Sequence, residues 1–266
     1  MRYSPKTEGI SDAFSFYHNG LFFVQNTHFF DSSFLPFCLA SGIGPDAASA
    51  NQDLSEIAKA PGGVGLERSR IVIRSGAKEA SIGVRSLQPS DILVSASVED
   101  SSFRPTDVFV VSPAVYRLKP MSENRLRLTQ TKPLPSDRES VFYVTINCIP
   151  SIPAGETNRM VAVISQRIKL FYRPKGLFGD SGYAASELKW SFKGNKLTAY
   201  NPTKLSVSAA WISFGTDELN IRDLILPGES ATWEISEKNL SLRTFKFTYI
   251  NEYGASNTYE VRLSPS

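Results

Sequence analysis

The side chains that most often carry catalysis or bind metal ions are scarce in this sequence. It contains two histidines, His18 and His28, and two cysteines, Cys38 and Cys148. An imidazole serves as a general base or a metal ligand, and a pair of cysteines forms a disulfide. Because three of these four residues lie within the first fifty, the fate of that segment decides which chemistry is available.

The first fifty residues differ in composition from the rest of the chain. Residues 14–37 are rich in phenylalanine, residues 34–40 form a short apolar core, and residues 48–50 have the small-x-small form of a signal-peptidase site. Two interpretations fit: a secretory leader spanning residues 1–50, or a poorly packed N-terminal extension.

Cleavage after Ala50 would remove both histidines and Cys38. A Ser-His-Asp triad, a histidine-ligated metal site and an internal disulfide would then be impossible, and the remaining Cys148 is best explained as a buried apolar thiol. The sequence also lacks a glycine-rich phosphate loop and a paired-carboxylate motif. We therefore expect no enzyme activity, no cofactor, no metal and no nucleotide.

Charge and hydropathy narrow the class of protein further. The net charge of +3 forms no basic stripe, which argues against a nucleic-acid partner. No apolar run approaches the length of a membrane span. A chain of 266 residues suits one large or two ordinary globular domains.

Short β-type runs separated by turn signals fill the chain from Val64 onward, with no sustained helical period. We predict an all-β protein with one antiparallel sandwich in residues 64–175 and a second in residues 183–266. Glycines in residues 176–186 predict a linker between them, and Gly194-Asn195 predicts a hairpin. The predicted strands of the second domain are 188–192, 196–200, 205–214, 231–235, 244–250 and 258–263.

The longest uninterrupted β-type run is residues 160–174, closed by a proline that cannot donate to a sheet. Met160, Ala162 and Ile164 point to one face and the valines between them to the other, so both faces are apolar. Such a strand is either central and covered on both sides by its own domain, or it offers its second face to a partner.

Dispersed motifs favour the second explanation. Residues 66–70 read Leu-Glu-Arg-Ser-Arg, residues 112–118 read Ser-Pro-Ala-Val-Tyr-Arg-Leu, and residues 134–143 read Leu-Pro-Ser-Asp-Arg-Glu-Ser-Val-Phe-Tyr. Residues 168–174 read Ile-Lys-Leu-Phe-Tyr-Arg-Pro, and residues 249–254 read Tyr-Ile-Asn-Glu-Tyr-Gly. These motifs, in this order, resemble those of the PapD-like periplasmic chaperones of chaperone–usher systems.

The resemblance implies a periplasmic chaperone of two immunoglobulin-like domains set at an angle. Such a protein binds pilin (fimbrial) subunits by donating a strand and delivers them to an outer-membrane usher. Met160, Ala162 and Ile164 match the donor positions, where Ala162 is smaller than the usual branched residue and should fill its pocket less well. The short link at residues 149–158 resembles that of the short-loop group.

The resemblance also implies that Arg70 and Lys169 anchor the C-terminal carboxylate of a subunit in the cleft between domains. Pattern alone predicts two solvated strand charges; the matched motifs place them in the cleft, with Lys169 partly exposed. Because strict alternation puts Lys169 on the face opposite Ile164, we expect a bulge or a strong twist between them.

Three further residues match an interdomain charge network of the same family: Glu139, Arg173 and Glu252, where Glu252 replaces the usual aspartate. Pattern alone would make them unrelated surface charges. The alternative function is a two-domain immunoglobulin-like adhesin or structural pilus component. Such a protein would expose polar clusters that bind carbohydrate and would not need two cations facing the cleft.

Overall fold

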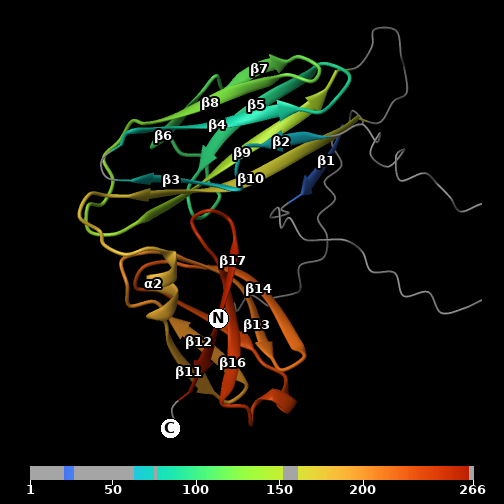
Figure 1. Cartoon of the computed structure of the whole chain (residues 1–266). Coiled ribbons are helices and arrows are strands. Elements are labelled where there is room, and N and C mark those ends of the chain that lie inside the picture. The colour runs from blue at the N-terminus through green and yellow to red at the C-terminus, as the bar shows by residue number, and fades with distance from the viewer. Residues whose placement is uncertain (1–20, 27–62, 75–76, 152–160, 264–266) are drawn as a thin grey trace, which may run out of the picture.

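The computed structural model describes residues 21–26, 63–74, 77–151 and 161–263, which form two β-sandwiches set at an angle (Figure 1). The all-β fold predicted from the sequence is confirmed. Most of the predicted leader, and Met160 of the predicted donor strand, lie outside the described residues.

The N-terminal sandwich consists of two sheets. One has the strand order β1-β10-β9-β5-β7, and the other has the order β2-β4-β8-β6. β3 pairs with β10, so the chain leaves the second sheet after β2 and enters the first at β3. The strands are β1 (Leu21–Asn26), β2 (Val64–Leu66), β3 (Arg70–Arg74), β4 (Glu79–Ser86), β5 (Ile92–Glu99), β6 (Phe109–Ser112), β7 (Val115–Leu118), β8 (Glu123–Gln130), β9 (Ser140–Pro150) and β10 (Val161–Arg173).

Alternating apolar residues of the two sheets fill the space between them. In β5 every second residue from Ile92 is buried, which is the period of a strand with one face on a core. Ile82, Val94, Leu126 and Val144 are completely buried in this core. Cys148 belongs to the same core and is free, and its burial raises the pKa of its thiol to about 12, so the predicted buried thiol is confirmed.

The C-terminal sandwich pairs a three-stranded sheet, β11-β12-β15, with a four-stranded sheet, β14-β13-β16-β17. Gly194, with a φ of +61°, and Asn195 form the predicted two-residue hairpin turn. The strands are β11 (Lys189–Lys193), β12 (Lys196–Tyr200), β13 (Val207–Phe214), β14 (Asp217–Ile225), β15 (Ser230–Glu234), β16 (Thr244–Ile250) and β17 (Ser256–Arg262), with a 3-10 turn η1 (Glu237–Asn239).

The segment predicted as a linker, residues 176–186, contains a short helix, α2 (Ser181–Ser186). Asp180 caps it by accepting a hydrogen bond from the backbone N–H of Tyr183 at 2.8 Å. Ala184 and Ala185 pack completely buried against the C-terminal core. The glycines predicted a loop, but capping and burial of two alanines stabilise one helical turn and fix the start of the second domain.

The described residues contain no cluster of metal-ligating side chains. No helix among them has both the length and the hydropathy needed to span a membrane.

Candidate functional site

A cleft of about 870 Å³ lies between the two sandwiches. Its walls come from strands and loops of both domains. Arg167 and Lys169 of β10 and Tyr143 of β9 line it from the first domain, while Asp223 of β14 and Tyr253 line it from the second.

Lys169 lines this cleft, and Arg70 lies beside it, against the neighbouring interdomain contacts of Glu139, Arg173 and Ile250. Arg70 and Lys169 are register partners of the parallel strands β3 and β10, which places both side chains on the same face of the sheet. Arg70 is 3% exposed and Lys169 is 7% exposed. The expectation that Lys169 is partly exposed is therefore wrong, because the second domain covers it. Arg70 donates a hydrogen bond to the backbone oxygen of Ile250, in the second domain, at 3.1 Å.

Burial makes both cations unusual. Desolvation lowers the pKa of Arg70 to about 10. Desolvation, and then repulsion by Arg70, lowers the pKa of Lys169 to about 7, while Asp223 acts in the opposite direction. Two adjacent buried cations can bind an anionic group strongly, because a carboxylate would relieve their repulsion and accept charge-assisted hydrogen bonds.

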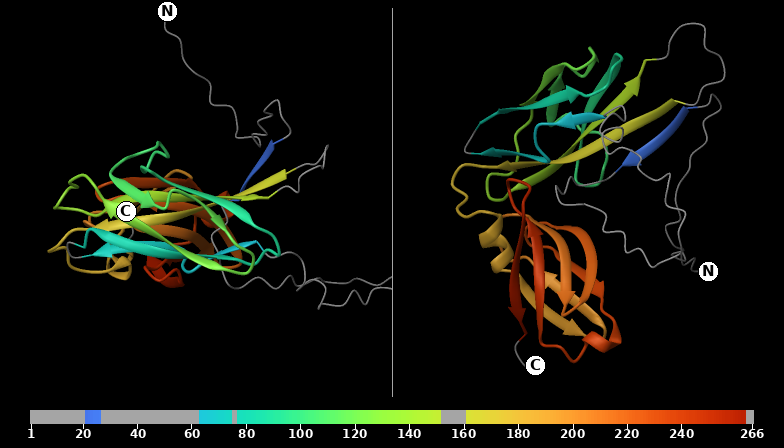
Figure 2. Two further views of the ribbon diagram at one scale, coloured as in Figure 1. Left: turned by 90° about the horizontal axis from the view of Figure 1, so that it is seen from above. Right: turned by 45° about the vertical axis from the view of Figure 1, so that its right-hand side comes forward.

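The outer edge of β10 is divided between two partners. Its first part, from Val161 to Gln166, pairs in parallel with β1. Its last part, from Lys169 onward, pairs in parallel with β3 (Figures 1 and 2). A parallel strand added to the first part therefore runs toward the point where Arg70 and Lys169 meet.

Ile164, the predicted donor residue whose side chain the structure describes, and Lys169 lie on opposite faces of β10. Ile168 and Leu170 face the core of the first domain, and the partly buried Ile164 lies on the same face of the strand. Lys169 lies on the opposite face, together with Arg173, which contacts the second domain. The pairing of β10 with β9 is continuous from Ile164 to Tyr172, so the expected bulge is absent. No bulge is needed, because Ile164 and Lys169 point to opposite faces of the same strand.

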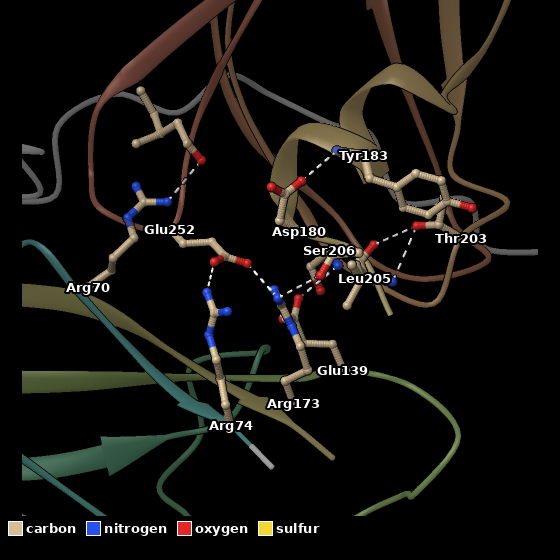
Figure 3. A network of polar contacts seen from close by, with 12 residues as sticks. Arg70, Arg74, Glu139, Arg173, Asp180, Tyr183, Thr203, Leu205, Ser206 and Glu252 are labelled. Carbon is tan, nitrogen blue, oxygen red and sulfur yellow. Dashed lines mark hydrogen bonds and ion pairs between the residues drawn. The ribbon is translucent and has the colours of Figure 1, made fainter. Parts of the chain in front are cut away.

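The predicted charge network is assembled between the domains (Figure 3). Arg173 binds Glu139 through Nε at 3.0 Å and Nη2 at 2.8 Å, and its Nη1 lies 2.5 Å from Glu252. All three side chains are less than a tenth exposed. Glu139 also accepts from the backbone N–H of Ser206 at 2.8 Å, which ties the first domain directly to the second.

Sequence reasoning missed a fourth member of this network. Arg74, at the end of β3, forms an ion pair with Glu252. Its side chain is 46% exposed and no motif marks it, so only the structure could identify it. The extra methylene of Glu252, compared with aspartate, does not prevent it from contacting both arginines.

A tight turn brings Glu252 to the interface. The side-chain oxygen of Asn251 accepts from the backbone N–H groups of Tyr253 at 2.9 Å and Ala255 at 3.0 Å. Gly254 has a φ of +92°, and a Cβ there would overlap the hydroxyl of Ser69 in the first domain. Only glycine combines this backbone conformation with this close approach.

The chain matches two family models. Residues 63–178 match the N-terminal domain of PapD, described as a pili and flagellar-assembly chaperone. Residues 183–261 match the C-terminal domain of PapD, described as a pili assembly chaperone.

Individual proteins are similar over most of their length. The chain is 32% identical over 198 residues to the probable fimbrial chaperone LpfB of Escherichia coli O157:H7, covering 73% of this chain and 85% of LpfB. It is 32% identical over 240 residues to the chaperone protein FimC of Escherichia coli O6:H1, covering 87% and 95%. Among solved structures, the SafB chaperone in complex with the SafA pilin of Salmonella enterica matches with a TM-score of 0.69 at 25% identity, covering 76% of this chain and 96% of that one.

Proposed function

The chain belongs to the PapD-like family of pilus-assembly chaperones, and we propose that it caps pilin subunits in the periplasm by adding β10 to their fold. Capping protects a subunit that would otherwise expose strand edges and apolar surface and would aggregate. The protein then hands the subunit to an outer-membrane usher. It acts by binding, and the proposal requires no cofactor.

The edge of β10 between Val161 and Gln166 is the surface that accepts the subunit. Main-chain hydrogen bonds along an added strand supply affinity, and alternate side chains supply specificity. β1 pairs with this edge in parallel, which supports the idea that a parallel strand of the subunit can pair with it in place of β1. Ile164 and the other proposed donor residues, Met160 and Ala162, then fill the apolar groove of the subunit.

The observation that carries this proposal is the position of Arg70 and Lys169 at the end of that edge. β3 begins to pair with β10 at Lys169, so an added parallel strand must stop there. Its terminal carboxylate would meet both cations. An anchored end also fixes the register, since a slip of one residue would turn the apolar side chains away from the groove.

Co-expression in the periplasm with a pilin of the source bacterium tests this function. Wild type is expected to co-purify with the pilin, and Lys169→Ala is expected to lose it while remaining folded by circular dichroism. Ile164→Ala should retain part of the pilin, because it removes packing worth at most about 2–5 kcal/mol. Lys175→Ala is the matched control, since Lys175 follows β10 and is exposed.

Two results would contradict the proposal. One is capture by folded Lys169→Ala that equals capture by wild type. The other is recovery of the wild-type chain from the periplasm without any pilin. N-terminal sequencing of the same periplasmic sample tests the predicted leader: the mature chain should begin near Asn51.

A further inference from the structure

The last strand of each domain pairs with the strand before it and turns its other edge outward. In the first domain this outer edge is covered, because β1 and β3 both pair with β10 in parallel. In the second domain β17 ends the sheet β14-β13-β16-β17, and no other strand in the described part of the chain pairs with its outer edge. β17 therefore lacks the parallel neighbour that β3 provides for β10.

Every second residue of β17 turns its main-chain groups toward this open edge. The backbone N–H of Leu263 donates to the oxygen of Arg243 at 2.9 Å, which fixes the alternation of hydrogen bonds between β16 and β17. In an antiparallel pair only every second residue bonds to the neighbouring strand. The residues whose N–H and C=O groups point away from β16 are consequently Ser256, Thr258, Glu260 and Arg262.

A cavity of about 640 Å³ lies beside the end of this edge, between β17 and β11. Its walls include Trp190 and Phe192 of β11 and the buried Val261 of β17. The volume lies within the range of ligand-binding pockets. A strand added to β17 would turn the side chains of one face into this cavity, as peptides do when they extend a sheet.

The rim of the cavity is positively charged. The residues that line it include three cations, Lys189, Arg243 and Arg262. The one carboxylate among these lining residues, Glu260, is already bonded to Arg262 at 2.9 Å. Lys189 and Arg243 form no ion pair with any residue that the structure describes. An acidic strand would therefore be attracted to this edge, and a basic strand would be repelled.

We propose that the outer edge of β17 binds an extended acidic segment of a partner protein as an added parallel strand. The segment takes the place beside β17 that β3 takes beside β10, and its acidic side chains face Lys189 and Arg243. Main-chain hydrogen bonds to the outward groups of β17 supply the affinity. This end of β17 lies on the side of the second domain away from the first (Figure 1), so the segment can bind while a subunit occupies the cleft.

Peptide titration against the full-length chain tests this edge. The probe is a seven-residue peptide of alternating aspartate and valine, acetylated at one end and amidated at the other, so that it offers no terminal carboxylate to the cleft. It should bind at least about tenfold more tightly than the same peptide with lysine in place of aspartate. Proline at two successive central positions should have a similar cost, because it removes main-chain donors on both sides of the strand.

Hydrogen exchange distinguishes strand addition from attraction of charge alone. The outward-pointing amides of Thr258, Glu260 and Arg262 should exchange more slowly when the acidic peptide is bound. Those of Tyr259 and Val261, which already bond to β16, should change little.

Variants locate the site. Arg243→Glu should weaken binding of the acidic peptide about tenfold. Lys193→Glu is the matched control, because Lys193 is exposed on β11 but does not line the cavity. Glu260→Pro removes an outward N–H that β16 does not use, so it should fold and abolish binding, and it keeps the test decisive if Arg243→Glu fails to fold. Lys169→Ala should bind this peptide as wild type does.

Four results would overturn the proposal. Two are the absence of binding and binding that leaves the outward amides unprotected. The third is loss of binding in Lys169→Ala, which would place the peptide in the cleft. The fourth is a dimer of the free chain, in sedimentation, that Glu260→Pro dissociates, because the edge would then pair with a second copy of the chain.

Discussion

Burial keeps the amine of Lys169 partly deprotonated near neutral pH. Its pKa is lowered to about 7 by desolvation and by Arg70, so it titrates near neutral pH in the free protein. A bound carboxylate favours the charged form and raises this pKa, so binding takes up a proton. Arg70, with a pKa of about 10, remains charged throughout this range.

We therefore predict that affinity for a free-acid C-terminal peptide falls as the pH rises. The loss should begin near pH 7 and approach at most about tenfold per pH unit above it. Calorimetric titration at several pH values provides the measurement. Lys169→Arg should lose most of this dependence, because a guanidinium stays charged; an unchanged slope in that variant would show that another group titrates.

The sequence predicted which residues would be neighbours better than it predicted their surroundings. The motifs placed Arg70 and Lys169 correctly as neighbours because they fix strand register. The burial of Arg70 and Lys169 could not be predicted, since it depends on how the second domain packs on the first. Arg74 escaped notice because it looks, in the sequence, like an ordinary exposed residue.

At the scale of elements, strands with clear alternation were the predictable part. β14 (Asp217–Ile225) was missed because acidic and polar residues interrupt its apolar pattern. It is a strand because it pairs with β13 over most of its length and buries Ile225. Tertiary pairing overrode a weak local preference in β14, whereas capping by Asp180 and burial of two alanines stabilised α2.

The turn after β16 is one of the elements through which the second domain contacts the first. Gly254→Ala should weaken peptide binding, because the added Cβ would displace the turn from Ser69 and move Ile250, to which Arg70 donates. The matched control is Gly215→Ala, which has a φ of +62° and open space around its Cβ. Both variants should lose roughly 1–2 kcal/mol of stability from backbone strain, but only Gly254→Ala should bind less tightly. Equal binding by the two variants would contradict this role for the turn.

β1 occupies the edge of β10 that the subunit would need. A variant that begins at Asn51 lacks β1, so we expect it to fold and to bind the free-acid peptide more tightly than the full-length chain. Titration of both purified forms provides the measurement. Equal affinities, together with equal hydrogen-exchange protection of residues 161–166, would show that β1 does not compete for this edge.

At the scale of the whole molecule, a buried ion network connects the two sandwiches. Arg173 contacts two carboxylates, one from each domain, and all three groups are almost fully buried. A buried ion pair need not add net stability, but the loss of one partner leaves an uncompensated buried charge. We therefore propose that the network sets the angle of the domains and with it the shape of the cleft.

We predict that Arg173→Met destabilises the protein by about 3–5 kcal/mol. Arg85→Met is the control, because Arg85 forms an ion pair with Glu123 in which its side chain is 65% exposed, and its loss should cost about 0–1 kcal/mol. Chemical denaturation of both variants measures the difference. Similar losses would mean that the network contributes no more than a surface ion pair.

We propose that Arg70 and Lys169 anchor the subunit's terminal carboxylate at the end of the β10 edge. The most direct test compares one pilin C-terminal peptide as a free acid and as its C-terminal amide, by calorimetric titration against wild type and Lys169→Ala. We predict that wild type binds the free acid roughly a hundredfold more tightly than the amide, and that most of this difference disappears in Lys169→Ala. Equal affinity of wild type for the acid and the amide would contradict the account.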